Sequence, residues 1–85
     1  MEDEIIDFIL GLKGITKGGF SENEIMELNL VEDLELDSIE LVELISFIEE
    51  HYEIEMKELS GFLESLGSIR EFISYVKGVV SSLIV

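Results

Sequence analysis

Ser38 carries the hydroxyl that is best placed in this chain to take part in chemistry. It follows Asp37 and precedes Ile39, at the point where a polar stretch gives way to a helical pattern. A serine becomes a nucleophile when a neighbouring base takes up its proton. The single histidine, His51, lies about four turns further along the same predicted helix, roughly 20 Å away. The sequence therefore predicts that a separate enzyme modifies Ser38 and that this chain is not itself an enzyme.

The predicted place of Ser38 at the start of a helix favours an attached anion. The N-terminal end of a helix carries partial positive charge, so a phosphodiester would be stabilised there. Asp37 could help to place a divalent cation that arrives with the incoming group. The simpler interpretation is that Asp37 or Ser38 only caps the helix, and Asp37 with Glu40 has capping-box spacing. Both roles remain open from the residues alone.

A metal site in this region fits the sequence poorly. Asp33, Glu35 and Asp37 have the spacing of the first EF-hand ligands, but the sixth position is Ser38 and the twelfth is Leu44. An EF-hand needs a glycine and a bidentate glutamate there. The chain also has no cysteine, which excludes disulfides and thiolate ligands. We expect no dedicated metal site in this chain, only weak surface binding of calcium or magnesium by its dense carboxylates.

The helices that must position Ser38 follow from the spacing of apolar residues. Apolar residues recur at helical spacing over 3–13, over 38–51 and in a last helix that opens at Gly67-Ser68, with a shorter helical turn at 57–63. The chain has 85 residues, 47% of them apolar, which suits one modest core. We therefore predict a single all-α domain over residues 1–85, a small bundle of three longer helices plus one short helix.

The stretch between the first two longer helices is predicted to be a long ordered loop. Ser21 and Glu24 have capping-box spacing and should start a short turn. Leu30, Leu34 and Leu36 then recur among acidic residues without a helical period. Because a structureless loop of this length is uncommon in a compact domain, we expect these leucines to anchor it in the core.

Acidic residues are concentrated in the middle of the chain. The formal net charge is −15, and no lysine or arginine occurs between Lys17 and Lys57. Such a chain repels nucleic acids and anionic membranes and attracts basic protein surfaces.

Its apolar C-terminal run, residues 79–85, is too short to span a bilayer, and no targeting segment is recognisable. We expect a cytoplasmic, monomeric protein without nucleic-acid or membrane partners.

Helix 38–51 carries two apolar stripes. One, formed by Leu41, Leu44, Ile45 and Ile48, should face the core. Ile39 and Val42 lie on a different face among the carboxylates, and exposed apolar groups rimmed by charge often mark an interface. The sequence therefore predicts a docking face beside Ser38.

The stretch around Ser38 resembles the phosphopantetheine attachment motif of acyl carrier proteins. Asp37-Ser38-Ile39 follows Leu34 and precedes Val42-Glu43-Leu44 as in that motif, and Glu49-Glu50 stand where the family has paired acids. Residues 68–76 resemble the family's final helix, and the length, acidity and long first loop are also similar. The resemblance covers nearly the whole chain.

This resemblance implies a freestanding acyl carrier protein with a 4′-phosphopantetheine arm on Ser38. A magnesium-dependent phosphopantetheinyl transferase would add the arm from coenzyme A, with Asp37 in a supporting role. The thiol of the arm would hold acyl groups as thioesters for enzymes of fatty-acid, polyketide or related biosynthesis that have basic docking surfaces. In this family the second helix is the recognition helix, which implies partner contacts at Ile39, Glu40, Val42, Glu43, Glu49 and Glu50.

The chain also departs from the family pattern. Glu35 stands where the family often has glycine, and Ile39 replaces the commoner leucine. These differences make a specialised pathway plausible. Two alternatives stay open: an aminoacyl or peptidyl carrier protein, and an unmodified interaction protein that keeps the carrier fold.

Overall fold

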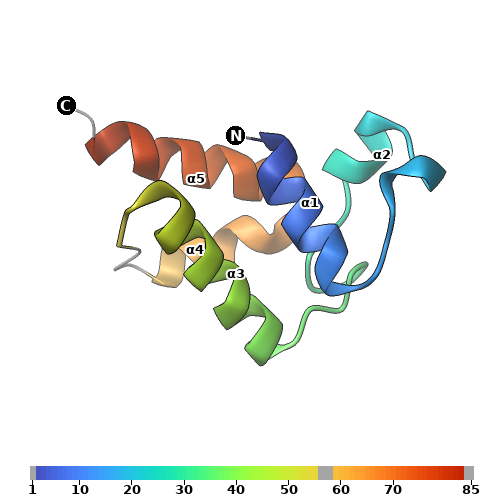
Figure 1. Ribbon diagram of the computed structural model, residues 1–85, viewed down its shortest axis with the longest axis horizontal. Helices are drawn as coiled ribbons and strands as arrows, with labels where there is room; N and C mark the ends of the chain where they lie inside the picture. The colour runs from blue at the N-terminus through green and yellow to red at the C-terminus, as the bar shows by residue number, and fades with distance from the viewer. Residues whose placement is uncertain (1, 56–58, 84–85) are drawn as a thin grey trace.

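Three longer and two short α-helices make up the chain in the computed structural model, which describes residues 2–55 and 59–83 (Figure 1). The helices are α1 (Glu2–Leu12), α2 (Glu22–Met26), α3 (Ser38–Tyr52), α4 (Leu59–Glu64) and α5 (Ile69–Leu83), with 3₁₀ turns η1 (Lys17–Gly19) and η2 (Ser65–Gly67). Over these residues the structure contains no strand. The predicted all-α fold is confirmed, and α2 is a short helix in the stretch predicted to be a turn and loop.

The core is formed by apolar side chains from all five helices and from the long loop. Helical spacing brings them to one face of each longer helix. The buried apolar residues of the helices are Ile5, Ile6, Ile9, Leu10, Ile25, Leu44, Ile48, Phe62, Ile69, Phe72, Ile73 and Val76. Each large side chain that is fully buried contributes about 1.5–3 kcal/mol of transfer free energy, so packing supplies the main stabilisation.

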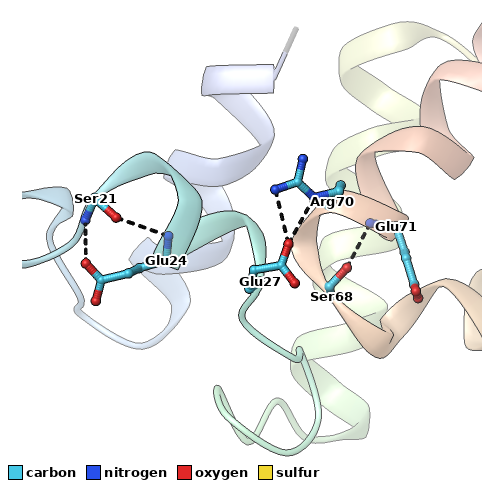
Figure 2. Close-up of polar contacts among 6 residues, drawn as sticks. All are labelled: Ser21, Glu24, Glu27, Ser68, Arg70 and Glu71. Atoms are coloured by element: carbon cyan, nitrogen blue, oxygen red, sulfur yellow. Dashed lines mark hydrogen bonds and ion pairs between the residues drawn. The ribbon is translucent and has the colours of Figure 1, made fainter.

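The helix ends are defined by a glycine after α1 and by capping side chains at the start of α2. Gly14, with φ +66°, follows α1, and the Ile15 amide donates to the Leu10 carbonyl at 3.0 Å. This left-handed ending suits glycine because it has no Cβ. At α2, the Ser21 and Glu24 side chains form the predicted capping box (Figure 2).

The beginning of α5 is tied to the end of α2. The Ser68 hydroxyl accepts a hydrogen bond from the Glu71 amide at 3.1 Å, so Ser68 caps α5. Beside it, Arg70 of α5 pairs with Glu27 just after α2, with Nη2 3.1 Å from Oε1 (Figure 2). The Arg70–Glu27 pair joins the first turn of α5 to the residue at which the long loop leaves α2.

The loop between α2 and α3 is ordered by its own backbone and by three buried leucines. Leu30, Leu34 and Leu36 are all buried, as predicted. The Leu30 amide donates to the Leu66 carbonyl, and the Leu36 amide donates to the Leu30 carbonyl, both at 3.1 Å. These bonds satisfy buried amides and bring the chain to the start of α3 in one position.

Helix α4 packs closely on α5. The rings of Phe62 and Phe72 meet edge to face with centroids 5.7 Å apart. A Cβ built on Gly61 would lie 2.8 Å from Cε1 of Tyr75, so this approach requires glycine. Helix α4 forms one side of a groove beside Ser38. Part of the predicted turn, residues 57 and 58, lies outside the described residues.

Candidate functional site

Ser38 is the first residue of α3, and Asp37 is the residue that caps this helix. Oδ1 of Asp37 accepts from the Glu40 amide at 2.8 Å, and Oε1 of Glu40 accepts from the Asp37 amide at 3.1 Å. The predicted Asp37–Glu40 capping box is therefore present. Because Asp37 performs the capping, the exposed Ser38 hydroxyl is not needed for it.

The histidine of the chain lies at the other end of α3. Nε2 of His51 is 2.7 Å from Oε2 of Glu4 in α1. This hydrogen bond lowers the pKa of Glu4, because it favours the charged carboxylate. With a rise of about 1.5 Å per residue, His51 is roughly 20 Å from Ser38 along the helix. His51 is thus too far from Ser38 to accept its proton.

An apolar groove begins at Ser38 and runs between α3 and α4. Its cavity has a volume of about 210 Å³. The lining residues are Ser38, Leu41, Val42, Ile45, Phe62 and Leu63. Leu41 and Ile45 belong to the stripe predicted to face the core, but they are only half-buried because they face this groove.

The sequence did not identify the α4 side of the groove. Phe62 and Leu63 lie next to each other in a short helix, and nothing in their spacing indicates which face of α3 they approach. Phe62 is buried, whereas Leu63 is 59% exposed. An exposed leucine beside a buried phenylalanine is a weak signal of a groove edge, because single exposed apolar residues are common.

The second apolar stripe of α3 faces outward. Ile39 is 71% exposed and Val42 is 60% exposed, which are large fractions for such side chains. Glu43 and Glu50 are exposed on the same side of the helix. The predicted combination of apolar residues rimmed by carboxylates is therefore present next to Ser38.

The remaining acidic residues of the predicted docking set are less accessible. Glu49 is half-buried. Glu40 lies on the side of α3 that faces α1, where its Oε1 is 2.7 Å from Nζ of Lys13. The hydrogen bond from Lys13 lowers the pKa of Glu40, and so does the hydrogen bond from the Asp37 amide. The structure thus leaves Glu43 and Glu50 exposed, whereas Glu40 is half-buried and paired with Lys13 and the Asp37 amide.

Neither a metal cluster nor a membrane helix is found in the described ranges. Over residues 2–55 and 59–83, no three histidine or acidic side chains converge where they could hold a metal ion. Within the same ranges, no helix has the length and apolar character needed to cross a bilayer.

The chain is similar to several curated proteins over most of its length. The acyl carrier protein of Chlamydia caviae is 31% identical over 77 residues, which are 91% of this chain and 92% of the relative. The acyl carrier protein of Clostridium acetobutylicum is 37% identical over 60 residues, or 69% of this chain and 75% of the relative. The acyl carrier protein of Syntrophobacter fumaroxidans is 30% identical over 76 residues, or 89% of this chain and 86% of the relative.

No protein-family model matches the chain, and no solved structure matches it. The relatives nevertheless span nearly all of it, at an identity of 30% or more. The family that these relatives share is consistent with the all-α fold of the chain and with the motif around Ser38. The chain therefore belongs to the acyl carrier protein family.

Proposed function

We propose that this protein carries acyl groups as thioesters on a 4′-phosphopantetheine arm attached to Ser38. The observation that carries the proposal is the position of Ser38, whose exposed side chain lies at the start of α3 and at the mouth of an apolar groove. When bound, the arm supplies the thiol that holds the acyl group. The relatives named acyl carrier protein support the same role.

The residues around Ser38 fit a phosphodiester at this position. The first amides of α3 and the helix dipole favour a negative charge at the N-terminus. Asp37 holds the first turn of α3 in place through the capping box, so Ser38 is presented in one orientation. His51 is paired with Glu4 at the far end of α3, and Oδ1 of Asp37 accepts from the Glu40 amide, so the proton of Ser38 would pass to a base of the transferase.

The groove suits an apolar acyl chain better than a charged aminoacyl group. Apart from Ser38, its lining is made of aliphatic and phenyl side chains. A charged amino group moved into such surroundings would lose its hydration without gaining a partner. This observation favours the acyl carrier over the aminoacyl or peptidyl carrier.

The outward face of α3 is the proposed contact surface for partner enzymes. It combines Ile39 and Val42 with Glu43 and Glu50, which suits a partner with basic residues around an apolar patch. The net charge of −15 supports such partners and disfavours nucleic acids and anionic membranes. The pathway would be fatty-acid, polyketide or related specialised biosynthesis.

Modification in vitro tests this proposal directly. The protein is incubated with coenzyme A, Mg²⁺ and a purified phosphopantetheinyl transferase, and intact mass is measured. We expect wild type to gain the mass of one arm and Ser38→Ala to gain none. Ser46→Ala is the matched control, because Ser46 is an exposed serine of the same helix, and it should be modified normally. No gain in wild type, or an undiminished gain in Ser38→Ala, would contradict the proposal.

A further inference from the structure

Lys13 and Glu40 form an ion pair beside Ser38 that the proposed function does not use. Nζ of Lys13, just after α1, is 2.7 Å from Oε1 of Glu40 in the first turn of α3. The two side chains are 28% and 17% exposed, whereas the side chains of Arg70 and Glu27 are 53% and 68% exposed. Water therefore screens the Lys13–Glu40 pair less than a typical surface pair.

The same carboxylate oxygen has a second hydrogen-bond donor. Oε1 of Glu40 also accepts from the Asp37 amide at 3.1 Å, so it is bound both to α1 and to the cap of α3. A basic side chain of a partner that approached Glu40 would have to displace Lys13 or share the carboxylate with it. Glu43, one turn further on, is exposed and has no ion-pair partner among the described side chains.

The position of Lys13 is fixed by the packing of α1 against α3. The contacts run in opposite directions along the two helices: Glu4 pairs with His51, Phe8 stacks on Phe47, and Lys13 pairs with Glu40. Backbone bonds at the end of α1 also hold Lys13, whose amide donates to the Leu10 carbonyl at 3.1 Å. Lys13 thus faces Glu40 because of the fold, not because of local chain geometry.

We propose that Lys13 is a specificity-determining residue of this carrier, because its pairing with Glu40 withholds the first carboxylate of α3 from partner enzymes. The charge available for docking then begins at Glu43, and partners are directed to the outward face of the helix. This inference rests on the proposed function, since it concerns how the enzyme that modifies Ser38 recognises the chain.

A double-mutant cycle on Lys13 and Glu40 tests the inference. KM and kcat for modification of Ser38 are measured with coenzyme A and a purified phosphopantetheinyl transferase for wild type, Lys13→Gln, Glu40→Gln and the double variant. Glutamine at position 40 can still complete the capping box. Lys77→Gln is the matched control, because it changes the net charge equally and releases Glu2 of α1, which belongs to neither the groove nor the outward face.

We expect Lys13→Gln to lower KM about two- to fivefold with kcat unchanged, as for a surface charge that becomes available to a partner. Glu40→Gln alone should leave KM nearly unchanged. In the Lys13→Gln background, Glu40→Gln should abolish the decrease in KM that Lys13→Gln causes. Lys13→Arg should have the same KM as wild type. The decrease in KM caused by Lys13→Gln should become smaller at high salt because the interaction is electrostatic. Melting curves of each variant establish that it is folded at the assay temperature.

Three results would overturn the inference while leaving the proposed function intact. Lys13→Gln and Lys77→Gln could change KM equally, which would reflect net charge alone. Glu40→Gln could raise KM as much in wild type as in the Lys13→Gln background, which would mean that Glu40 is already available. Lys13→Gln could lower kcat, which would assign Lys13 to the presentation of Ser38. A wild-type protein that is not modified at all would instead contradict the proposed function, and the inference with it.

Discussion

The ring of Phe8 in α1 stacks on the ring of Phe47 in α3, with centroids 4.2 Å apart and ring planes 7° from parallel. His51 stacks on Phe47 as well, at 5.2 Å. This stack lies between the Glu4–His51 and Lys13–Glu40 pairs, in the middle of the contact between the two helices. The stack therefore helps to set the rotation of α3 about its own axis. This rotation decides which residues of α3 face outward.

Replacing Phe47 tests the contribution of this stack to stability. Phe47→Leu keeps an apolar side chain but removes the ring, and should lower the free energy of unfolding by about 1 kcal/mol, as for other aromatic pairs. Urea unfolding measures the change. Phe20→Leu is the control, because Phe20 is an exposed phenylalanine before α2. An equal loss in both variants would show that the stacked Phe47 ring adds no more stability than an exposed phenylalanine does.

Glu35 is predicted to be a strained position. Its φ is +51°, in the left-handed region that side chains other than glycine and asparagine rarely adopt. A glycine at this position would adopt the same conformation without a Cβ. Glu35→Gly should raise the free energy of unfolding by up to about 1 kcal/mol, after the entropy that glycine adds to the unfolded chain is subtracted. Thermal or urea unfolding measures it.

Glu35→Gln separates strain from charge at the same position. It removes the same negative charge as Glu35→Gly but keeps the Cβ. We expect Glu35→Gln to raise the free energy of unfolding less than Glu35→Gly does. Equal gains would attribute the effect to charge repulsion in this acidic chain and not to the backbone.

Reversing the charge of Glu43 tests the outward face as a docking surface. Glu43→Lys should raise KM of the transferase roughly fivefold or more, because a rim charge of the wrong sign repels a basic partner. The melting temperature should change little, since Glu43 is exposed. Glu22→Lys changes the net charge equally in α2, away from the start of α3 (Figure 1), and should have a smaller effect. Unchanged kinetics in Glu43→Lys would argue against the docking face.

Acid should weaken the ion pair between Glu40 and Lys13. The pKa of Glu40 is lowered in the folded protein, mainly by the hydrogen bond from Lys13, from an ordinary value of 4.5. A lowered folded pKa means that the carboxylate stabilises the fold above pH 4.5 and that this contribution is lost as the pH falls through the folded pKa. The urea midpoints of wild type and Glu40→Gln should therefore differ at pH 7 and converge as the pH falls through the folded pKa of Glu40. A difference that does not change with pH would contradict this assignment.

Much of the fold could be predicted from residues that lie close together in the chain. The apolar periods that predicted the longer helices correspond to α1, α3 and α5, because a period near 3.6 residues is a local property of the helix. The capping boxes at Ser21 and Asp37 were predicted for the same reason, since each joins residues three apart. Leu30, Leu34 and Leu36 were expected in the core because a loop of this length needs buried side chains to order it, and all three are buried.

Other features were not evident from local patterns. Helix α2 has only five residues, too few for an amphipathic period to be recognised. Glu35 was noted as a departure from the family, but its left-handed backbone is visible only in the structure. Phe62 and Leu63 line the groove because Gly61 lets α4 approach Tyr75 of α5, and this contact is remote in sequence.

The sequence by itself determined that Ser38 begins a helix, that Asp37 precedes it and that acidic residues follow. It did not distinguish Glu40 from Glu43, which are the same residue type three positions apart. In an α-helix these two side chains point about 60° apart, and the helical period alone treats them alike. The tertiary structure decided between them, because α1 packs against the side of α3 that bears Glu40 and brings Lys13 to it, while Glu43 remains exposed. The rotation of α3 is set by contacts with α1, such as that between Phe8 and Phe47, which no stretch of local sequence encodes.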